Sequence, residues 1–343
     1  MKLLLCASCR SHDLSLTIFK SFEEGGVVAD GVITCDACHT SYKVEDGLPE
    51  LILRQPQCFT LDNEFTRRYA TELADLSLTR PAPSTGREVD EHKIGQAAIF
   101  DEIVKIYEGM TESHFWRAVD RHVFGLWGED LSRHSMLLEV GCGNGRISRP
   151  MATGNTTVVG VDISRGMLKK AIKTAEEEGN QSIHYLMGDA ENMPLRSEIF
   201  DACLIYGVLH HLNSPPDCLK EVGRVLEPGG HFYALENNRS VFRWMFDVLV
   251  KVKKLWEEHA SNHYVMSQAE VKAWGRNASL DLTTSTMVYL PPQLANPLGG
   301  KGAVLALRLT EKLFGSLPFF RNHGGLLYIR GTRSRNNSTQ QSL

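Results

Sequence analysis

The chain has 343 residues, 42% of them hydrophobic and 23% charged, a composition typical of a globular protein with one large domain or two modest ones. Its formal net charge of −4 argues against a general attraction to nucleic-acid phosphates. No run approaches the roughly 18 apolar residues of a membrane span. The apolar run after Met1 is too short for a signal peptide, so a cytoplasmic protein is expected.

Four of the eight cysteines form two closely spaced pairs near the start of the chain, Cys6 with Cys9 and Cys35 with Cys38. Two C-x-x-C pairs can place four thiolates tetrahedrally around Zn²⁺. A redox pair or unrelated buried thiols are the alternatives, but short paired spacing in a cytosolic protein favours a metal. Residues 1–53 are therefore predicted to form a zinc ribbon with these four ligands.

The segment between the two cysteine pairs and the segment after the ribbon differ in pattern. Apolar residues alternate from Leu14 to Ile18, and Gly25-Gly26 supplies a turn, which together predict a hairpin. Residues 54–93 are turn-rich and charged with little periodicity, which predicts a linker with a short helix around residues 64–74.

Helical periodicity begins after this linker. Between Ile94 and Trp127 the apolar residues recur at helical spacing and form two stripes. Gly109 is predicted to separate the two helices. The aromatic residues of this region are interpreted as packed against the core, with a substrate pocket as the alternative.

A glycine-rich turn follows the first strong strand signal of the core. The apolar run from Met136 to Val140 leads into Gly141, Gly143 and Gly145. An apolar run of this kind is typical of a buried parallel strand, and glycine lets the backbone approach a ligand closely. The G-x-G-x-G spacing differs from the G-x-G-x-x-G of dinucleotide-binding proteins.

Strands and helices then alternate. Strands are predicted at 157–161, 183–187, 200–206 and 231–236, with helices at 164–178 and 215–226 between them. This alternation predicts a parallel sheet with helices on both faces and a ligand at the carboxyl ends of the strands. Asp162, at the tip of the second strand, is placed to accept hydrogen bonds from ribose hydroxyls.

The C-terminal third departs from simple alternation. Residues 237–280 are predicted to be a helical insertion whose first helix is amphipathic and is interpreted as packed, as a lid, or as touching a membrane. Strands at 282–289 and 325–331, with a helix at 302–314, complete the sheet. A domain over 94–332 is thus expected, followed by a disordered tail at 333–343.

The motifs LLEVGCGNGRIS, VVGVDIS, GDAENMPL, FDACLIYGVLHHL and RVLEPGG occur in this order between residues 137 and 230. In sequence and order they resemble the class I S-adenosylmethionine (SAM)-dependent methyltransferases. The resemblance implies an α/β Rossmann-like fold with a seven-stranded, mostly parallel sheet, helices on both faces and an antiparallel last strand. Residues 35–51 resemble the zinc-ribbon activator subunit of tRNA and protein methyltransferases, which adds a small N-terminal β zinc ribbon to the expected fold.

The resemblance also implies roles for individual residues. Glu139 is expected near the amino group of SAM, Asp189 is expected to accept from the adenine amino group, and Tyr206 is expected beside the sulfonium. The complete set of expected cofactor-binding residues is Glu139, Gly141, Gly143, Gly145, Asp162, Ile163, Met167, Asp189, Ala190 and Tyr206.

A general base is needed when the methyl acceptor is a hydroxyl or a protonated amine. His210 and His211 are the nearest candidates, since imidazole titrates near neutrality. The alternative is that one of them only hydrogen-bonds the next helix. Cys142 and Cys203 fall in buried-strand patterns, so a cysteine nucleophile is disfavoured. No Asn/Asp-Pro-Pro-Tyr motif follows the fourth strand, which argues against exocyclic base amines as acceptors.

Three functions remain open from the sequence, all with SAM and zinc as the expected cofactors. The first is methylation of a small molecule or of a lipid- or sugar-linked intermediate, because the fourth-strand motif and the insertion resemble the quinone-biosynthesis and natural-product branch of the family. The second is rRNA or tRNA base methylation with the ribbon gripping RNA, which the sparse basic residues of the ribbon disfavour. The third is an assembly role with a vestigial methyltransferase core. The oligomeric state is not indicated.

Overall fold

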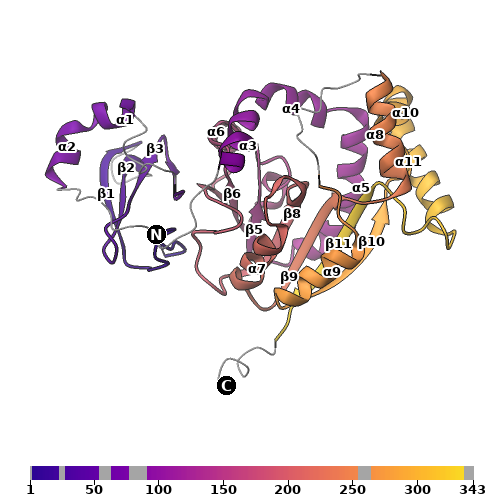
Figure 1. Cartoon of the computed structure of the whole chain (residues 1–343). Coiled ribbons are helices and arrows are strands. Elements are labelled where there is room, and N and C mark those ends of the chain that lie inside the picture. Colours follow the sequence, from indigo (N-terminus) through magenta and orange to yellow (C-terminus); the bar gives the residue numbers. More distant parts are fainter. Residues whose placement is uncertain (1, 23–27, 54–62, 77–90, 254–263, 336–343) are drawn as a thin grey trace.

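Two β-sheets organise the chain in a computed structural model that describes residues 2–22, 28–53, 63–76, 91–253 and 264–335 (Figure 1). A four-stranded sheet lies at the N-terminus and a seven-stranded sheet forms the body of the molecule. The expected architecture, an α/β domain with a small β ribbon in front of it, is confirmed.

The small sheet is an antiparallel ribbon with the strand order β1-β2-β3-β4. A two-residue Asp46-Gly47 turn joins its last two strands, and both residues have the positive φ angles, 53° and 77°, that such a turn demands. The predicted turn at Gly25-Gly26 lies outside the described residues. The strands are β1 (Leu14–Ser21), β2 (Val28–Cys35), β3 (Ser41–Glu45) and β4 (Leu48–Pro49).

The large sheet has the order β10-β11-β9-β8-β5-β6-β7. β11 runs antiparallel to both of its neighbours, β9 and β10, whereas the other pairs are parallel, as expected from the sequence. The carboxyl ends of β5 to β9 therefore meet at one edge. The strands are β5 (Met136–Val140), β6 (Thr157–Asp162), β7 (Ile183–Met187), β8 (Phe200–Tyr206), β9 (Leu226–Asn237), β10 (Leu280–Met287) and β11 (Leu326–Arg333).

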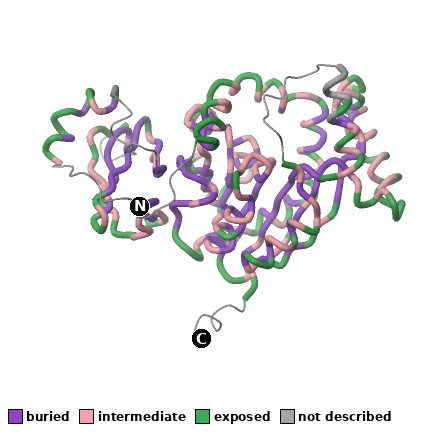
Figure 2. Tube along the Cα trace, viewed as in Figure 1, coloured by how far each residue is buried: buried purple, intermediate pink, exposed green. Residues whose placement is uncertain are grey.

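Helices cover both faces of this sheet (Figures 1 and 2). Serine residues cap two of them: Ser164 caps α6, which begins where the sequence predicts, and Ser267 forms a capping box with Glu270 at the start of α9. The helices of the large domain are α3 (Glu91–Glu102), α4 (Val104–Thr111), α5 (His114–Leu131), α6 (Arg165–Glu177), α7 (Pro215–Val225), α8 (Val241–Lys253), α9 (Gln268–Asn277), α10 (Pro292–Ala295) and α11 (Gly299–Gly315), with short 3₁₀ turns η1 (Arg149–Met151), η2 (Leu209–His211) and η3 (Asn296–Leu298).

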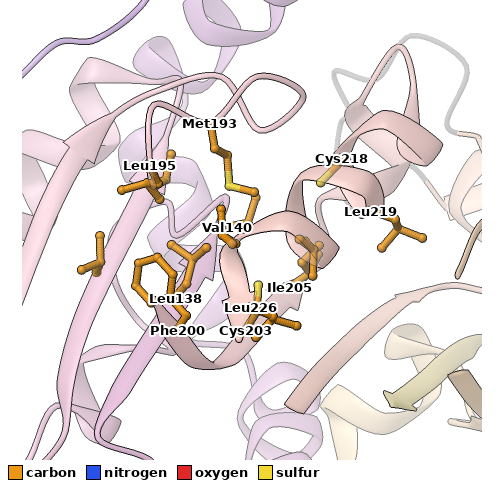
Figure 3. Close-up of a cluster of buried hydrophobic side chains, with 14 of the residues drawn as sticks. Leu138, Val140, Met193, Leu195, Phe200, Cys203, Ile205, Cys218, Leu219 and Leu226 are labelled. Carbon is orange, nitrogen blue, oxygen red and sulfur yellow. The ribbon is translucent and has the colours of Figure 1, made fainter. Parts of the chain in front are cut away.

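Residues on successive strand positions divide between two apolar cores. Leu138, Val140 and Cys203 pack on one face of the sheet together with α7 and part of the ribbon (Figure 3). Leu137 packs on the opposite face with α5 and α6. Cys203 is fully buried and Cys142 is 5% exposed, and burial raises the pKa of both thiols. Both cysteines therefore lie among packed residues, as expected.

The region before the first strand of the sheet corrects the sequence prediction. Gly109 lies inside α4 and does not end it; the breaks fall at Ile103 and at Ser113, whose hydroxyl caps α5 by accepting from Trp116 N. Isolated glycine weakens a helix by only about 1 kcal/mol, which packing offsets. The helix expected at 64–74 is divided at Tyr69 into α1 (Asn63–Arg68) and α2 (Ala70–Asp75).

The ribbon is joined to the edge of the large sheet. Leu51 N donates to Met187 O at 2.9 Å, so the chain after β4 continues the sheet beyond β7. Leu5 N donates to Pro194 O at 2.9 Å on the segment that follows β7. The ribbon thus contacts the segment that carries Asp189.

Candidate functional site

The glycine-rich turn after β5 has the backbone that its sequence predicts. Gly141, Gly143 and Gly145 all have positive φ, at 68°, 52° and 73°. A Cβ at Gly141 would lie 2.3 Å from Val208, but a Cβ at Gly143 would meet no atom within 4 Å. Gly143 therefore leaves open space where a ligand can approach the backbone.

Asp162 holds this turn in place. Its Oδ2 accepts from Gly143 N at 2.7 Å and its Oδ1 accepts from Ser164 N at 2.8 Å. Burial raises the pKa of Asp162, and these backbone N–H groups oppose that rise. Asp162 thus connects the glycine turn to the start of α6.

A cavity of about 840 Å³ opens at the carboxyl ends of β5 to β8. Eight of the ten residues predicted to bind the cofactor line it, and they are Gly141, Gly143, Asp162, Ile163, Met167, Asp189, Ala190 and Tyr206. Gly145 lies behind it, where a Cβ would collide with Tyr185 Oη at 2.3 Å. The structure brings the predicted set together around one space.

Glu139 also lies behind the cavity wall rather than in it. It is 1% exposed at the end of β5, and burial raises its pKa to about 8. A carboxyl group with this pKa is mostly protonated at pH 7.

Lys93 of α3 meets Asp189 at the far end of the cavity. Its Nζ lies 2.7 Å from Asp189 Oδ2 and 2.9 Å from Glu191 Oε2, and all three side chains are at least nine-tenths buried. Asp189 Oδ1 in turn accepts from Glu191 N at 2.9 Å. Lys93 therefore compensates two buried carboxylates beside the position expected to receive adenine.

A second cavity of about 1190 Å³ adjoins the first. The two share the lining residues Gln96, Phe100, Tyr107, Tyr206, Gly207 and His211. Its wall toward α3 and α4 is apolar, and is formed by Ile99, Phe100, Ile103, Ile106 and Met110. A ligand in one cavity would thus face a ligand in the other across Tyr206 and Gly207.

An ion pair fixes the tyrosine at this junction. Tyr206 Oη donates to Asp120 Oδ1 at 2.7 Å, and Asp120 also pairs with Arg146. The Arg146 guanidinium lies 5.1 Å from the centre of the Tyr206 ring, within the range of a cation–π contact. Burial raises the pKa of Tyr206 well above its usual value, so its hydroxyl stays protonated and bonded to Asp120.

The two candidate bases differ in their partners. His210 Nδ1 lies 2.8 Å from Glu236 Oε2, and Glu236 Oε1 accepts from the backbone N–H groups of Val208 and Leu209, both at 2.7 Å. The His211 ring contacts the His210 ring at a tilt of 40°, with 4.0 Å between ring centres. With Glu236 ionised, its carboxylate accepts from His210 Nδ1 and favours the tautomer that carries its proton there.

The four predicted metal ligands also converge. The sulfur atoms of Cys6, Cys9, Cys35 and Cys38 all lie within 4.8 Å of one another, with Cys6 3.5 Å from Cys38 and Cys9 3.6 Å from Cys35. Tetrahedral zinc with Zn–S bonds of about 2.3 Å separates its sulfurs by about 3.8 Å. The donor set and its spacing fit a zinc ion.

Some residues of the site were missed by the sequence analysis. Glu236 lies one position before the end of β9, and Asp162 ends β6, so the same rule, an acid near the tip of a parallel strand, could have identified it. Lys93, Asp120 and Arg146 carry no such signal, because they come from helices or a loop whose placement the pattern does not specify. Lys93 and Arg146 each line a cavity, and Asp120 holds Tyr206.

Comparisons with known proteins agree with this geometry. Residues 138–234 match the family described as a methyltransferase domain. A ubiquinone biosynthesis O-methyltransferase of Idiomarina loihiensis is 29% identical over 55% of this chain and 73% of that protein. A ubiquinone/menaquinone biosynthesis C-methyltransferase of Acidiphilium cryptum is 32% identical over 43% of this chain and 60% of its own length.

Among solved structures, the [4+2]-cyclase SpnF aligns with a TM-score of 0.52 at 17% identity, over 72% of this chain and 98% of its own. That likeness concerns the fold. No helix in the described ranges has both the length and the apolar character needed to cross a bilayer.

Proposed function

We propose, for a chain that belongs to the class I SAM-dependent methyltransferases, that it methylates a hydroxyl group of a small, largely apolar molecule seated in the second cavity. The observation that carries the proposal is the meeting of the two cavities at Tyr206, Gly207 and His211, with His210 in the lining of the second cavity. The curated relatives that act in quinone biosynthesis support an acceptor of this size and polarity.

The cofactor set supports SAM as the donor, which supplies an activated methyl group when bound. Gly143 leaves room for it, and Asp162 is the proposed partner of the ribose hydroxyls. Asp189 and Ala190 line the part of the cavity proposed for adenine. Four cysteines are the proposed ligands of a structural zinc ion: Cys6, Cys9, Cys35 and Cys38.

The acceptor is held by the apolar wall of α3 and α4, which also excludes water from the junction. Transfer requires the acceptor oxygen in line with the methyl group at about 3 Å, so the residues' main task is positioning. We assign His210 the role of general base, because Glu236 orients its ring in the lining of the second cavity, where the acceptor hydroxyl is proposed to lie. As the new C–O bond forms, the C–S bond breaks and the sulfur keeps the electron pair.

The proposal is tested by incubating the purified protein with methyl-labelled SAM and two substrate pools, an extract of small metabolites and total RNA. Label in an organic-soluble small molecule supports the proposal, whereas label in RNA overturns it. His210→Asn should lower the transfer rate about 100-fold with unchanged SAM affinity, and His184→Asn, at an exposed position of β7, is the matched control. Equal rates for the wild type and His210→Asn would refute the assignment of the base.

A further inference from the structure

The outer face of α11 is unusual for a helix on a protein surface. Leu305, Leu309 and Leu313, spaced four residues apart, are 59%, 57% and 58% exposed. The opposite face of the same helix is anchored by buried Ala303 and Leu307 against the second apolar core. The three leucines therefore project away from the body of the molecule on successive turns.

The same face carries positive charge. Lys301, Arg308 and Lys312 are exposed and fall three or four residues from these leucines, so they lie among them on the helix surface. Within the ranges that the structure describes, none of the three cations forms an ion pair. Glu311 is the single acidic residue between 299 and 325, and it points elsewhere, with its carboxylate 2.9 Å from His122 Nε2.

Exposed apolar residues continue onto the neighbouring elements. The segment after α11 exposes Phe319 by 71%, and α8 exposes Trp244 by 67%. α10, which contacts both α8 and α11, exposes Leu294 by 53%. In Figure 1 these three helices lie together at the end of the molecule opposite the ribbon.

We propose that the outer face of α11, formed by Lys301, Leu305, Arg308, Leu309, Lys312 and Leu313, docks onto the surface of an anionic lipid bilayer. A helix of 17 residues lying flat would bury its leucines among the acyl chains near the headgroups. The lysine and arginine stems would extend their charges to the lipid phosphates.

Charge selects this occupant over a second copy of the chain. The whole protein has a net charge of −4, so the cations on α11 form a positive patch on a protein of opposite net charge. Two copies meeting through this face would bring six cations together with no acid on the face to compensate them, which is unfavourable. An anionic bilayer offers both the apolar layer and the opposite charge.

Vesicle flotation with the full-length protein tests the proposal. Wild-type protein should float with vesicles of phosphatidylglycerol and phosphatidylcholine and not with phosphatidylcholine alone. Replacing the three cations by glutamine (K301Q/R308Q/K312Q) should weaken binding on the order of 100-fold in total, because each lost charge weakens it by about tenfold or less. The experiment reads binding alone, so it does not depend on methyl transfer.

Leu309→Glu should abolish flotation, and Ile18→Glu, an equally exposed apolar position on the ribbon, should leave it intact. Light scattering without lipid provides the opposing outcome. A stable dimer that Leu309→Glu dissociates would assign the face to a second copy and overturn the proposal. Flotation that is indifferent to lipid charge, or unchanged in Leu309→Glu, would overturn it as well.

Discussion

His210 Nδ1 lies 2.8 Å from Glu236 Oε2 in the lining of the second cavity, and Glu236 is 1% exposed. Burial raises the pKa of Glu236 to about 7, although two backbone N–H groups hydrogen-bond its ionised form. The charge that orients His210 is therefore lost as the pH falls through neutrality. The orientation of the proposed base therefore depends on pH.

Glu236→Gln should lower kcat about 100-fold and remove the rise of kcat between pH 6 and 8 that the ionisation of Glu236 produces. The glutamine amide would donate to His210 Nδ1 and place the proton on Nε2, the atom that must accept one. A pH–rate profile checks this expectation. Glu227→Gln, at an exposed position of the same strand, should leave the profile unchanged.

The raised pKa of Glu139 predicts that a proton is released when SAM binds. Its pKa of about 8 leaves it mostly protonated at pH 7, and a nearby ammonium group would lower that pKa. SAM binding should therefore release up to one proton per site near pH 7 and become tighter as the pH rises toward 8. Calorimetric titration in phosphate and in Tris should give different binding enthalpies. Identical enthalpies in the two buffers would contradict the expected proximity of Glu139 to the amino group of SAM. Glu139→Gln should abolish the difference in enthalpy.

Arg10 links the ribbon to the cofactor cavity. Its guanidinium donates to Asn192 Oδ1 at 2.9 Å and to Met193 O at 2.8 Å, just after Asp189 on the chain, and pairs with Glu221 at 3.0 Å. Arg10→Ala should weaken SAM binding about tenfold through loss of these charge-assisted bonds while zinc content stays unchanged. Arg196→Ala, which removes one exposed bond from the same segment to Lys2 O, is the control. Equal SAM affinity in Arg10→Ala and the wild type would show that the ribbon does not influence SAM binding through Arg10.

The first two glycines of the turn, Gly141 and Gly143, should respond differently to replacement by alanine. Gly143→Ala adds a Cβ that meets no protein atom, so the cost to folding is limited to about 1–2 kcal/mol for the positive φ, while SAM affinity is lost because the space is filled. Gly141→Ala should lower Tm further, because its Cβ would lie 2.3 Å from Val208. Thermal melts with and without SAM distinguish the two. A Gly143→Ala variant that SAM stabilises as it does the wild type would contradict the assigned space.

The sheet and the cofactor end of the site were predictable because their signals are local. Apolar runs followed by glycine or aspartate mark where each parallel strand ends, and parallel topology brings those ends together. The strand ends alone place Asp162, Asp189 and Tyr206 at one cavity, and the roles that the family resemblance implies for them stay predictions.

The remaining residues of the two cavities were not predictable, because they come from elements whose packing decides their place. Lys93 lay within the segment interpreted as a linker, yet it belongs to α3 and reaches Asp189 96 positions along the chain. The sequence analysis placed the break at Gly109 and overlooked the one at Ser113. A serine that caps the next helix marks where that helix begins, whereas a single glycine only weakens a helix and does not end it. Glu236 was at hand, at the end of a predicted strand, but unused.

The pairing of Leu51 with Met187 has a consequence for the solubility of the protein. β7 is the last strand of its sheet, and an uncovered last strand offers its backbone to any other extended chain. The ribbon occupies that position, and Leu51 and Leu53 are nearly fully buried there. Severing residues 1–53 would uncover this edge of the sheet as well as remove the four-cysteine cluster. The ribbon thus covers the edge strand through which the large domain would otherwise self-associate.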